Sequence, residues 1–129
     1  MGALLQIHGI LGERVLPLLI LIVGIWLAVS WRPNAPANPA TRFFPILVDI
    51  QVLIGIILFV YLLVGGKTTL LGFPFILHPI LGLVASFVAH RGVRGAGLLP
   101  ALGRWSAAAS LGILLVIVII NIVVAMQTA

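Results

Sequence analysis

Six side chains in this sequence could take part in chemistry, because each is a polar residue set in a long apolar stretch. They are His8, Asp49, Gln51, His78, His90 and Asn121. An ionisable or amide group in an apolar environment is costly, so it usually faces other protein groups and often marks a functional site. We therefore examine these six residues as candidates for holding a cofactor or for joining helices.

Four apolar stretches carry these residues and account for nearly all of the 129-residue chain. Each is about long enough to cross a bilayer, because a hydrocarbon core of about 30 Å needs roughly 20 helical residues. The sequence therefore predicts an all-α fold, in which residues 1–129 form one integral membrane four-helix bundle. The expected helices cover about residues 4–31, 46–64, 70–90 and 105–126.

The first helix must begin well before Pro17, because a helix starting there would reach only about 22 Å. We expect it to begin near Leu4, to kink at Pro17 and to be kept as a helix rather than removed as a signal peptide. Glu13 and Arg14 then lie near the outer interface. The hypothesis for these two charges is that they extend toward water or bind a partner subunit.

The composition excludes several classes of function. Hydrophobic residues make up 63% of the chain, charged residues 7%, and cysteine is absent. Without cysteine there is no disulfide, thiolate metal site or c-type haem attachment. The sequence has no phosphate-binding loop, serine-hydrolase elbow or zinc-protease motif, so we predict no catalytic residue and no independent catalytic activity.

The basic residues indicate an orientation in the membrane rather than a nucleic-acid surface, because each stands at a helix end or in a connection. One side of the expected bundle holds Arg32, Arg42, Arg91, Arg94 and Arg104, and the other holds Arg14 and Lys67. This asymmetry predicts that loops 32–45 and 90–104 are cytoplasmic and that both termini lie outside a plasma or inner membrane. Four prolines in segment 32–45 predict an extended loop there.

The candidate residues sort by depth on this topology. The outer half is expected to hold His8, His78 and Asn121, and the inner half Asp49, Gln51 and His90. Helical spacing places His78 on one face with Gly82, Ala85 and Ala89, where small side chains leave room for a neighbouring backbone or a flat ligand. His90 lies about 18 Å further along the axis, so it cannot share a metal ion with His78.

Three interpretations of His78 stay open at this point: an interior hydrogen-bonded histidine, an axial haem ligand, or a partner of a quinone. His8 is either an exposed terminal residue or a histidine at the depth of His78. His90 is either an interfacial residue or the ligand of an inner haem whose propionates meet Arg91, Arg94 or Arg104.

For the remaining polar residues we expect structural roles. Asp49 is expected to pair with an arginine at the inner boundary. Gln51 and Asn121 are expected to make contacts between helices.

Two segments carry a resemblance to a known group of proteins. The segments "DIQVLIGIILFVY" (Asp49–Tyr61) and "LHPILGLVASFVAHRG" (Leu77–Gly92) resemble small four-helix membrane proteins labelled cytochrome b-like. The matching positions are His8, Gln51 with Leu53 and Gly55, His78 with Pro79, and Ala89 with His90. The chain departs from the pattern at Leu77, where an acidic residue is common, and at Arg91, where Ile or Val is usual.

This resemblance implies a b-type haem with His78 and His8 as axial ligands, and with His90, Gln51, Arg91 and Arg94 as further cofactor-binding candidates. The predicted function is that of a small subunit associated with a respiratory or photosynthetic electron-transfer complex. Its expected partners are the lipid bilayer and other membrane subunits, and no nucleic acid. The alternatives are a cofactor-free accessory or assembly subunit and a quinone-contact protein.

Overall fold

Helices follow the apolar stretches in the computed structural model, which describes residues 1–33, 38–94 and 97–127. The elements in chain order are α1 (Gly2–Ile10), the π-helical segment η1 (Leu11–Val15), α2 (Leu16–Ser30), α3 (Ala40–Val64), the short 3₁₀ helix η2 (Thr68–Leu71), α4 (Leu77–Gly92), the 3₁₀ helix η3 (Pro100–Trp105) and α5 (Ser106–Met126). The described residues contain no strand. The all-α prediction is therefore confirmed.

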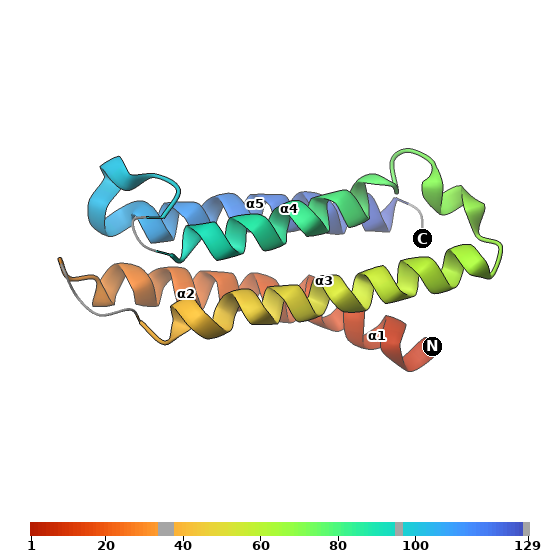
Figure 1. Ribbon diagram of the computed structural model, residues 1–129, viewed down its shortest axis with the longest axis horizontal. Coiled ribbons are helices and arrows are strands. Elements are labelled where there is room, and N and C mark those ends of the chain that lie inside the picture. Colours follow the sequence, from red (N-terminus) through yellow and green to blue (C-terminus); the bar gives the residue numbers. More distant parts are fainter. Residues whose placement is uncertain (34–37, 95–96, 128–129) are drawn as a thin grey trace.

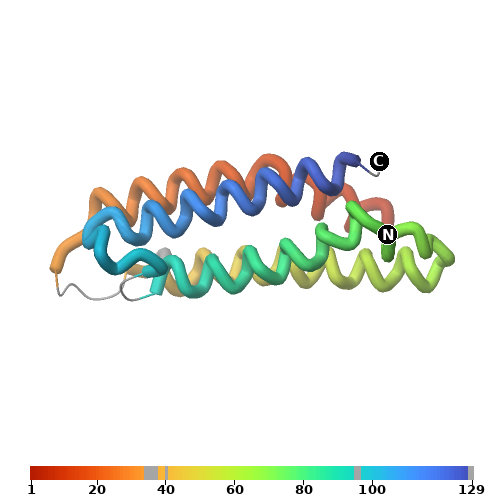
Figure 2. The backbone as a smooth tube through the Cα atoms, turned by 90° about the horizontal axis from the view of Figure 1, so that it is seen from above, coloured from red at the N-terminus to blue at the C-terminus, as the bar shows by residue number. Residues whose placement is uncertain are grey.

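The long helices run antiparallel and occupy the corners of a bundle (Figures 1 and 2). Helix α2 packs on α5, α5 on α4, and α4 on α3, while α3 closes the ring against α1 and α2. The first helix and α4 consequently stand at opposite corners. Side chains that point inward from these two corners meet across the centre of the bundle.

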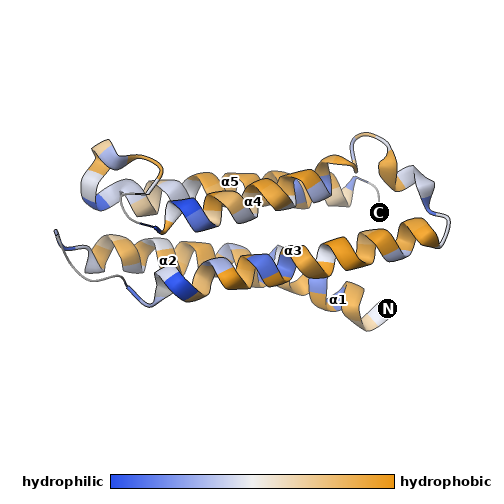
Figure 3. Cartoon of the chain, in the orientation of Figure 1, coloured by the Kyte–Doolittle hydropathy of each residue, from blue (hydrophilic) through white to orange (hydrophobic). Residues whose placement is uncertain are grey.

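Apolar residues make up most of every long helix (Figure 3), and many large ones, such as Val29, Leu53 and Val116, are exposed. Three helical stretches are long and apolar enough to cross a membrane: Gly2–Ser30, Thr41–Val64 and Pro100–Met126. In the most apolar window of Thr41–Val64 only 11% of the residues are buried within the protein. Internal packing therefore does not account for this apolar surface.

The third predicted helix, residues 70–90, is shorter than expected. Helix α4 begins at Leu77 and has 16 residues, which is about 24 Å and less than a bilayer core. The positions of two prolines agree with this late start. A helix interior disfavours Pro74, whereas Pro79 falls in the first turn of α4, where no intrahelical N–H is needed.

The sequence predicts a loop over the whole proline-rich segment 32–45, and this prediction is wrong for residues 40–45, which are helical. Helix α3 begins at Ala40, with Pro39 at its N-cap and Pro45 inside the helix. Thr41 supports this start by donating its side-chain hydroxyl to the carbonyl of Asn38 at 2.6 Å. Residues 34–37 of the predicted loop lie outside the described part of the chain.

The first helix begins at Gly2 and continues to Ser30 through a π-helical turn rather than a simple kink at Pro17. Within this turn the N–H of Leu16 donates to the carbonyl of Leu11, five residues earlier. Pro17 has no N–H to donate to the carbonyl four residues earlier, and the π-helical turn changes the hydrogen-bond register just before it. Helix α1 diverges from the line of α2 beyond this turn (Figure 1), and Glu13 and Arg14 are exposed in it.

We expect Gly92→Ala to destabilise the bundle, because a Cβ at Gly92 would stand 2.9 Å from Cβ of Ser110 on α5. Relieving such a contact costs about 1–3 kcal/mol of unfolding free energy. Gly112→Ala is the matched control, because a Cβ there meets nothing within 4 Å. Thermal unfolding in detergent, followed by circular dichroism, measures both variants. Equal transition temperatures for the two would contradict the close approach of α4 and α5.

Candidate functional site

A cavity of about 280 Å³ lies inside the bundle, where α1, α3, α4 and α5 come together. Its walls are mostly apolar, and its polar lining residues are His8, Glu13, Gln51, His78 and Asn121. An apolar cavity with a few converging polar groups is the usual form of a ligand site, and its volume is near the lower end of about 300 Å³ for such sites.

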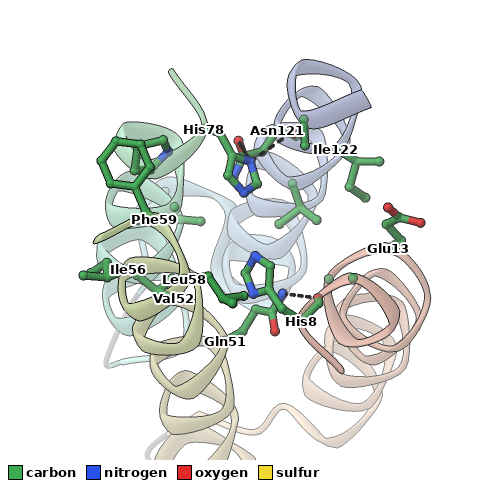
Figure 4. A pocket seen from close by; sticks show the side chains of 18 of the residues that line it. His8, Glu13, Gln51, Val52, Ile56, Leu58, Phe59, His78, Asn121 and Ile122 are labelled. Carbon is green, nitrogen blue, oxygen red and sulfur yellow. Dashed lines mark hydrogen bonds between the residues drawn. The ribbon is translucent and has the colours of Figure 1, made fainter. Parts of the chain in front are cut away.

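Two imidazole rings face one another across this cavity, His8 from α1 and His78 from the first turn of α4 (Figure 4). Their ring centroids are 6.0 Å apart and their planes are nearly perpendicular, at 86°. The two histidines come from opposite corners of the bundle, so they approach the cavity from opposite sides. The prediction that His8 reaches the depth of His78 agrees with this arrangement.

The ring of His78 is held by Asn121 on α5. Its Nδ1 lies 2.9 Å from Oδ1 of Asn121 and 3.4 Å from the backbone carbonyl oxygen of the same residue. Both oxygens accept hydrogen bonds, so they favour the tautomer in which Nδ1 carries the proton. The lone pair is then on Nε2, which is the nitrogen free to bind a metal ion.

The ring of His8 is held by close contact with α3. Gln51 Nε2 donates to the backbone carbonyl of His8 at 2.7 Å, which joins α1 to α3. The ring itself lies over Gly55, where a Cβ would stand 2.8 Å from Cε1 of His8. Only a glycine at position 55 leaves this space for the imidazole.

Two buried polar atoms beside the cavity lack a hydrogen-bond partner among the described residues: Nδ1 of His8 and Oε1 of Gln51. Buried polar atoms are nearly always paired in native proteins. Their position at the cavity wall is consistent with a partner that enters the cavity, such as a ligand or water.

A second polar cluster lies between α3 and α4, away from the two facing histidines. His90 Nε2 is 2.7 Å from Oδ2 of Asp49, and Ser86 donates its hydroxyl to Oδ1 of Asp49. The Asp49 and His90 side chains are 43% and 35% exposed. The expected pairing of Asp49 with an arginine is therefore wrong, because its two oxygens are engaged by His90 and Ser86.

The structure thus divides the predicted site residues into two groups. His8, Gln51, His78 and Asn121 come together at the cavity, although Gln51 was expected at a different depth from the other three. His90 stands with Asp49 instead. Arg91 is exposed in the last turn of α4, about 20 Å from His78 along the helix, and Arg94 is exposed just beyond the helix end; neither lines the cavity.

Three further residues at the cavity and the second polar cluster were not predicted from the sequence. Ser86 precedes His90 by one helical turn, a spacing that places the two on one face of α4 and could have indicated a shared partner. Phe75, whose ring centroid is 5.3 Å from that of His78, lies in the connection before α4 and had no periodic signal. Glu13 lies in the π-helical turn at the edge of the cavity, with its carboxylate pointing away from the two histidines (Figure 4).

The cavity brings together two imidazoles, those of His8 and His78, as its nitrogen donors toward an entering group. Among the described residues no three His, Cys, Asp or Glu side chains gather to form a metal site. Haem iron needs only two axial ligands from the protein. His8 and His78 are the residues at this cavity that would hold the iron of such a group.

A comparison of this chain with family models, with curated proteins and with solved structures finds no match in any of the three. Function is therefore inferred from the geometry of the cavity and from the residue pattern of the chain.

We expect Gly55→Ala to displace the His8 ring, since the added Cβ would overlap Cε1. The ring can rotate aside, so the cost in stability is small, about 1 kcal/mol, the scale of an unfavourable rotamer. The imidazole NMR signals of His8 and His78 should nevertheless both shift. Gly82→Ala is the control, because its Cβ would be 3.8 Å from Val52, an ordinary contact. Unchanged imidazole signals in Gly55→Ala would contradict the described position of His8.

Proposed function

We propose that this chain is a small integral membrane subunit that binds one b-type haem between His8 and His78 and takes part in electron transfer. The observation that carries the proposal is the pair of imidazoles, which reach one cavity from opposite corners of the bundle with centroids 6.0 Å apart. The resemblance to cytochrome b-like proteins independently points to the same two histidines.

The protein residues would have separate tasks at this site. His8 and His78 would hold the haem iron through imidazole nitrogens, and Asn121 would orient His78 with the lone pair on Nε2 free to bind. Gly55 leaves room for the ring of His8. The apolar helices would keep water away, which influences the reduction potential of a bound group. A bound haem would supply reversible one-electron transfer at its iron.

Insertion in a bilayer is part of the same proposal. It is supported by three helical stretches of sufficient length and by their apolar outer faces. We further propose that the end of the bundle carrying Arg32, Arg42, Arg91, Arg94 and Arg104 faces the cytoplasm. A larger electron-transfer complex is the proposed partner, because the partly exposed Asp49 and His90 pair would be better satisfied against another subunit than in lipid.

A quinone-contact protein is the second candidate, favoured by the unpartnered Oε1 of Gln51 and Nδ1 of His8. A quinol hydroxyl donates a hydrogen bond, so the amide oxygen of Gln51 would accept from it. Haem and quinone make different predictions for the purified protein, because only haem gives a strong visible absorption band.

The haem proposal predicts a Soret band in protein extracted with a mild detergent, at about one haem per chain. Both His78→Ala and His8→Ala should lose this band, because each removes one axial ligand. His90→Ala is the matched control and should keep the band, since His90 stands with Asp49 outside the cavity. A native gel of the same extract tests for a larger assembly.

Protein without stoichiometric haem after gentle extraction would contradict the haem proposal. Quinone retained by that protein and lost on Gln51→Leu would favour the second candidate. If both are absent and the chain migrates with a larger complex, a cofactor-free accessory subunit is the remaining function.

The proposed orientation predicts how single cysteines react. The chain has no cysteine of its own, so each variant carries one thiol. Thr68→Cys lies between α3 and α4 and should react with an impermeant maleimide on intact cells. Pro33→Cys lies just after α2 and should react only after the membrane is opened. The reverse pattern would show that the arginine-bearing end faces outward.

A further inference from the structure

A groove of about 450 Å³ runs along the outside of the bundle between α2 and α5, separate from the histidine cavity. Its floor is formed by small residues of both helices: Gly24 and Ala28 on α2, and Ala108 and Gly112 on α5. The rest of its lining is apolar apart from Arg104, which stands at one end beside Trp105. The groove is therefore a long apolar surface with a cation at its mouth.

The space in front of Gly112 is not used by the packing of the chain itself. A Cβ at Gly112 would meet nothing within 4 Å, whereas a Cβ at Gly24 would be in ordinary contact with Leu111 at 3.7 Å. A larger side chain at position 112 would consequently fill the groove without a clash inside the bundle.

The length of the groove matches one leaflet of a bilayer. On α2 its lining extends from Ile20 to Val29, which is nine residue steps or about 14 Å of helix. Half of a hydrocarbon core of about 30 Å is about 15 Å. A helix from another subunit would cross both leaflets, whereas an acyl chain occupies one.

The charge at the mouth of the groove complements an anionic headgroup. The Arg104 guanidinium lies 5.8 Å from the ring centroid of Trp31, and both residues are at the bundle end that carries four further arginines. The only acidic residues of the chain, Glu13 and Asp49, do not line the groove. Tryptophan rings such as Trp31 and Trp105 favour the headgroup layer, which places this end at the depth of lipid phosphates.

We propose that the groove between α2 and α5 is a binding site for an anionic phospholipid. One acyl chain lies along Gly24, Ala28, Ala108 and Gly112, and the phosphate pairs with Arg104. This inference rests on the bilayer insertion proposed above and is independent of haem binding.

Native mass spectrometry of the full chain tests the site, with the protein in micelles that contain equal amounts of phosphatidylglycerol and phosphatidylcholine. We expect one phosphatidylglycerol to be retained per chain. Gly112→Phe should lower this retention at least tenfold by filling the groove. Arg104→Gln should lower the preference for phosphatidylglycerol about fivefold, the factor associated with one basic residue near an anionic lipid surface.

Two control variants distinguish lipid binding in the groove from general effects of added bulk or of lost positive charge. Ile113→Phe places the same phenyl side chain one residue further on, on an exposed face of α5 outside the groove, and should retain the lipid. Arg94→Gln removes an exposed arginine of the same end that does not line the groove. An equal loss in Arg94→Gln and Arg104→Gln, or unchanged retention in Gly112→Phe, would overturn the proposal.

Sedimentation in the same micelles tests the other occupant. A dimer that becomes monomeric on Gly112→Phe would mean that the groove binds a second copy of the chain, which also overturns the lipid site. Failure of bilayer insertion itself would be seen separately, as release of the protein from membranes at alkaline pH.

Discussion

Polar groups on apolar helices must find their partners inside the protein, and this constraint accounts for how the helices of this chain meet. Gln51 on α3 donates to the carbonyl of His8, and Asn121 on α5 accepts from His78 at the start of α4. Each bond joins two helices that are otherwise held by apolar contacts. In a surrounding of lipid tails, apolar contacts between helices are weakly specific, so these bonds have a large share in setting which faces meet.

The same bonds determine the shape of the cavity. The π-helical turn at Leu11–Val15 lets α1 diverge from the line of α2 and approach α3. Gln51 then fixes α1 at His8, and Gly55 leaves the space that the imidazole occupies. On the opposite side Pro74 and Pro79 delay the start of α4, so that His78 stands in its first turn. A cavity between two histidines is the combined result.

Three regions of the molecule would then serve different tasks at different depths. The histidine cavity is enclosed by α1, α3, α4 and α5, and is suited to a cofactor. The Asp49, Ser86 and His90 cluster is partly exposed between α3 and α4, and is suited to contact with a neighbouring subunit. The groove between α2 and α5 opens at the arginine-bearing end, and is suited to a lipid. Their separation allows each to be changed by mutation without the others.

Composition and apolar length by themselves determined the helical class, because apolar stretches of about 20 residues are typical of helices and much longer than ordinary strands. They also identified the polar residues to examine. They did not determine the helix ends at Ala40 and Leu77, where prolines are tolerated or excluded according to their place in a turn. The pairing of the polar residues was decided by tertiary structure alone. Helical periodicity gives the face on which His8, Gln51 or Asp49 lies, but the partner depends on the tilt and neighbours of each helix. The tilt and the neighbours of each helix follow from the π-helical turn and from the corner positions of α1 and α4. The spacing of residues along the chain reveals neither the turn nor these positions.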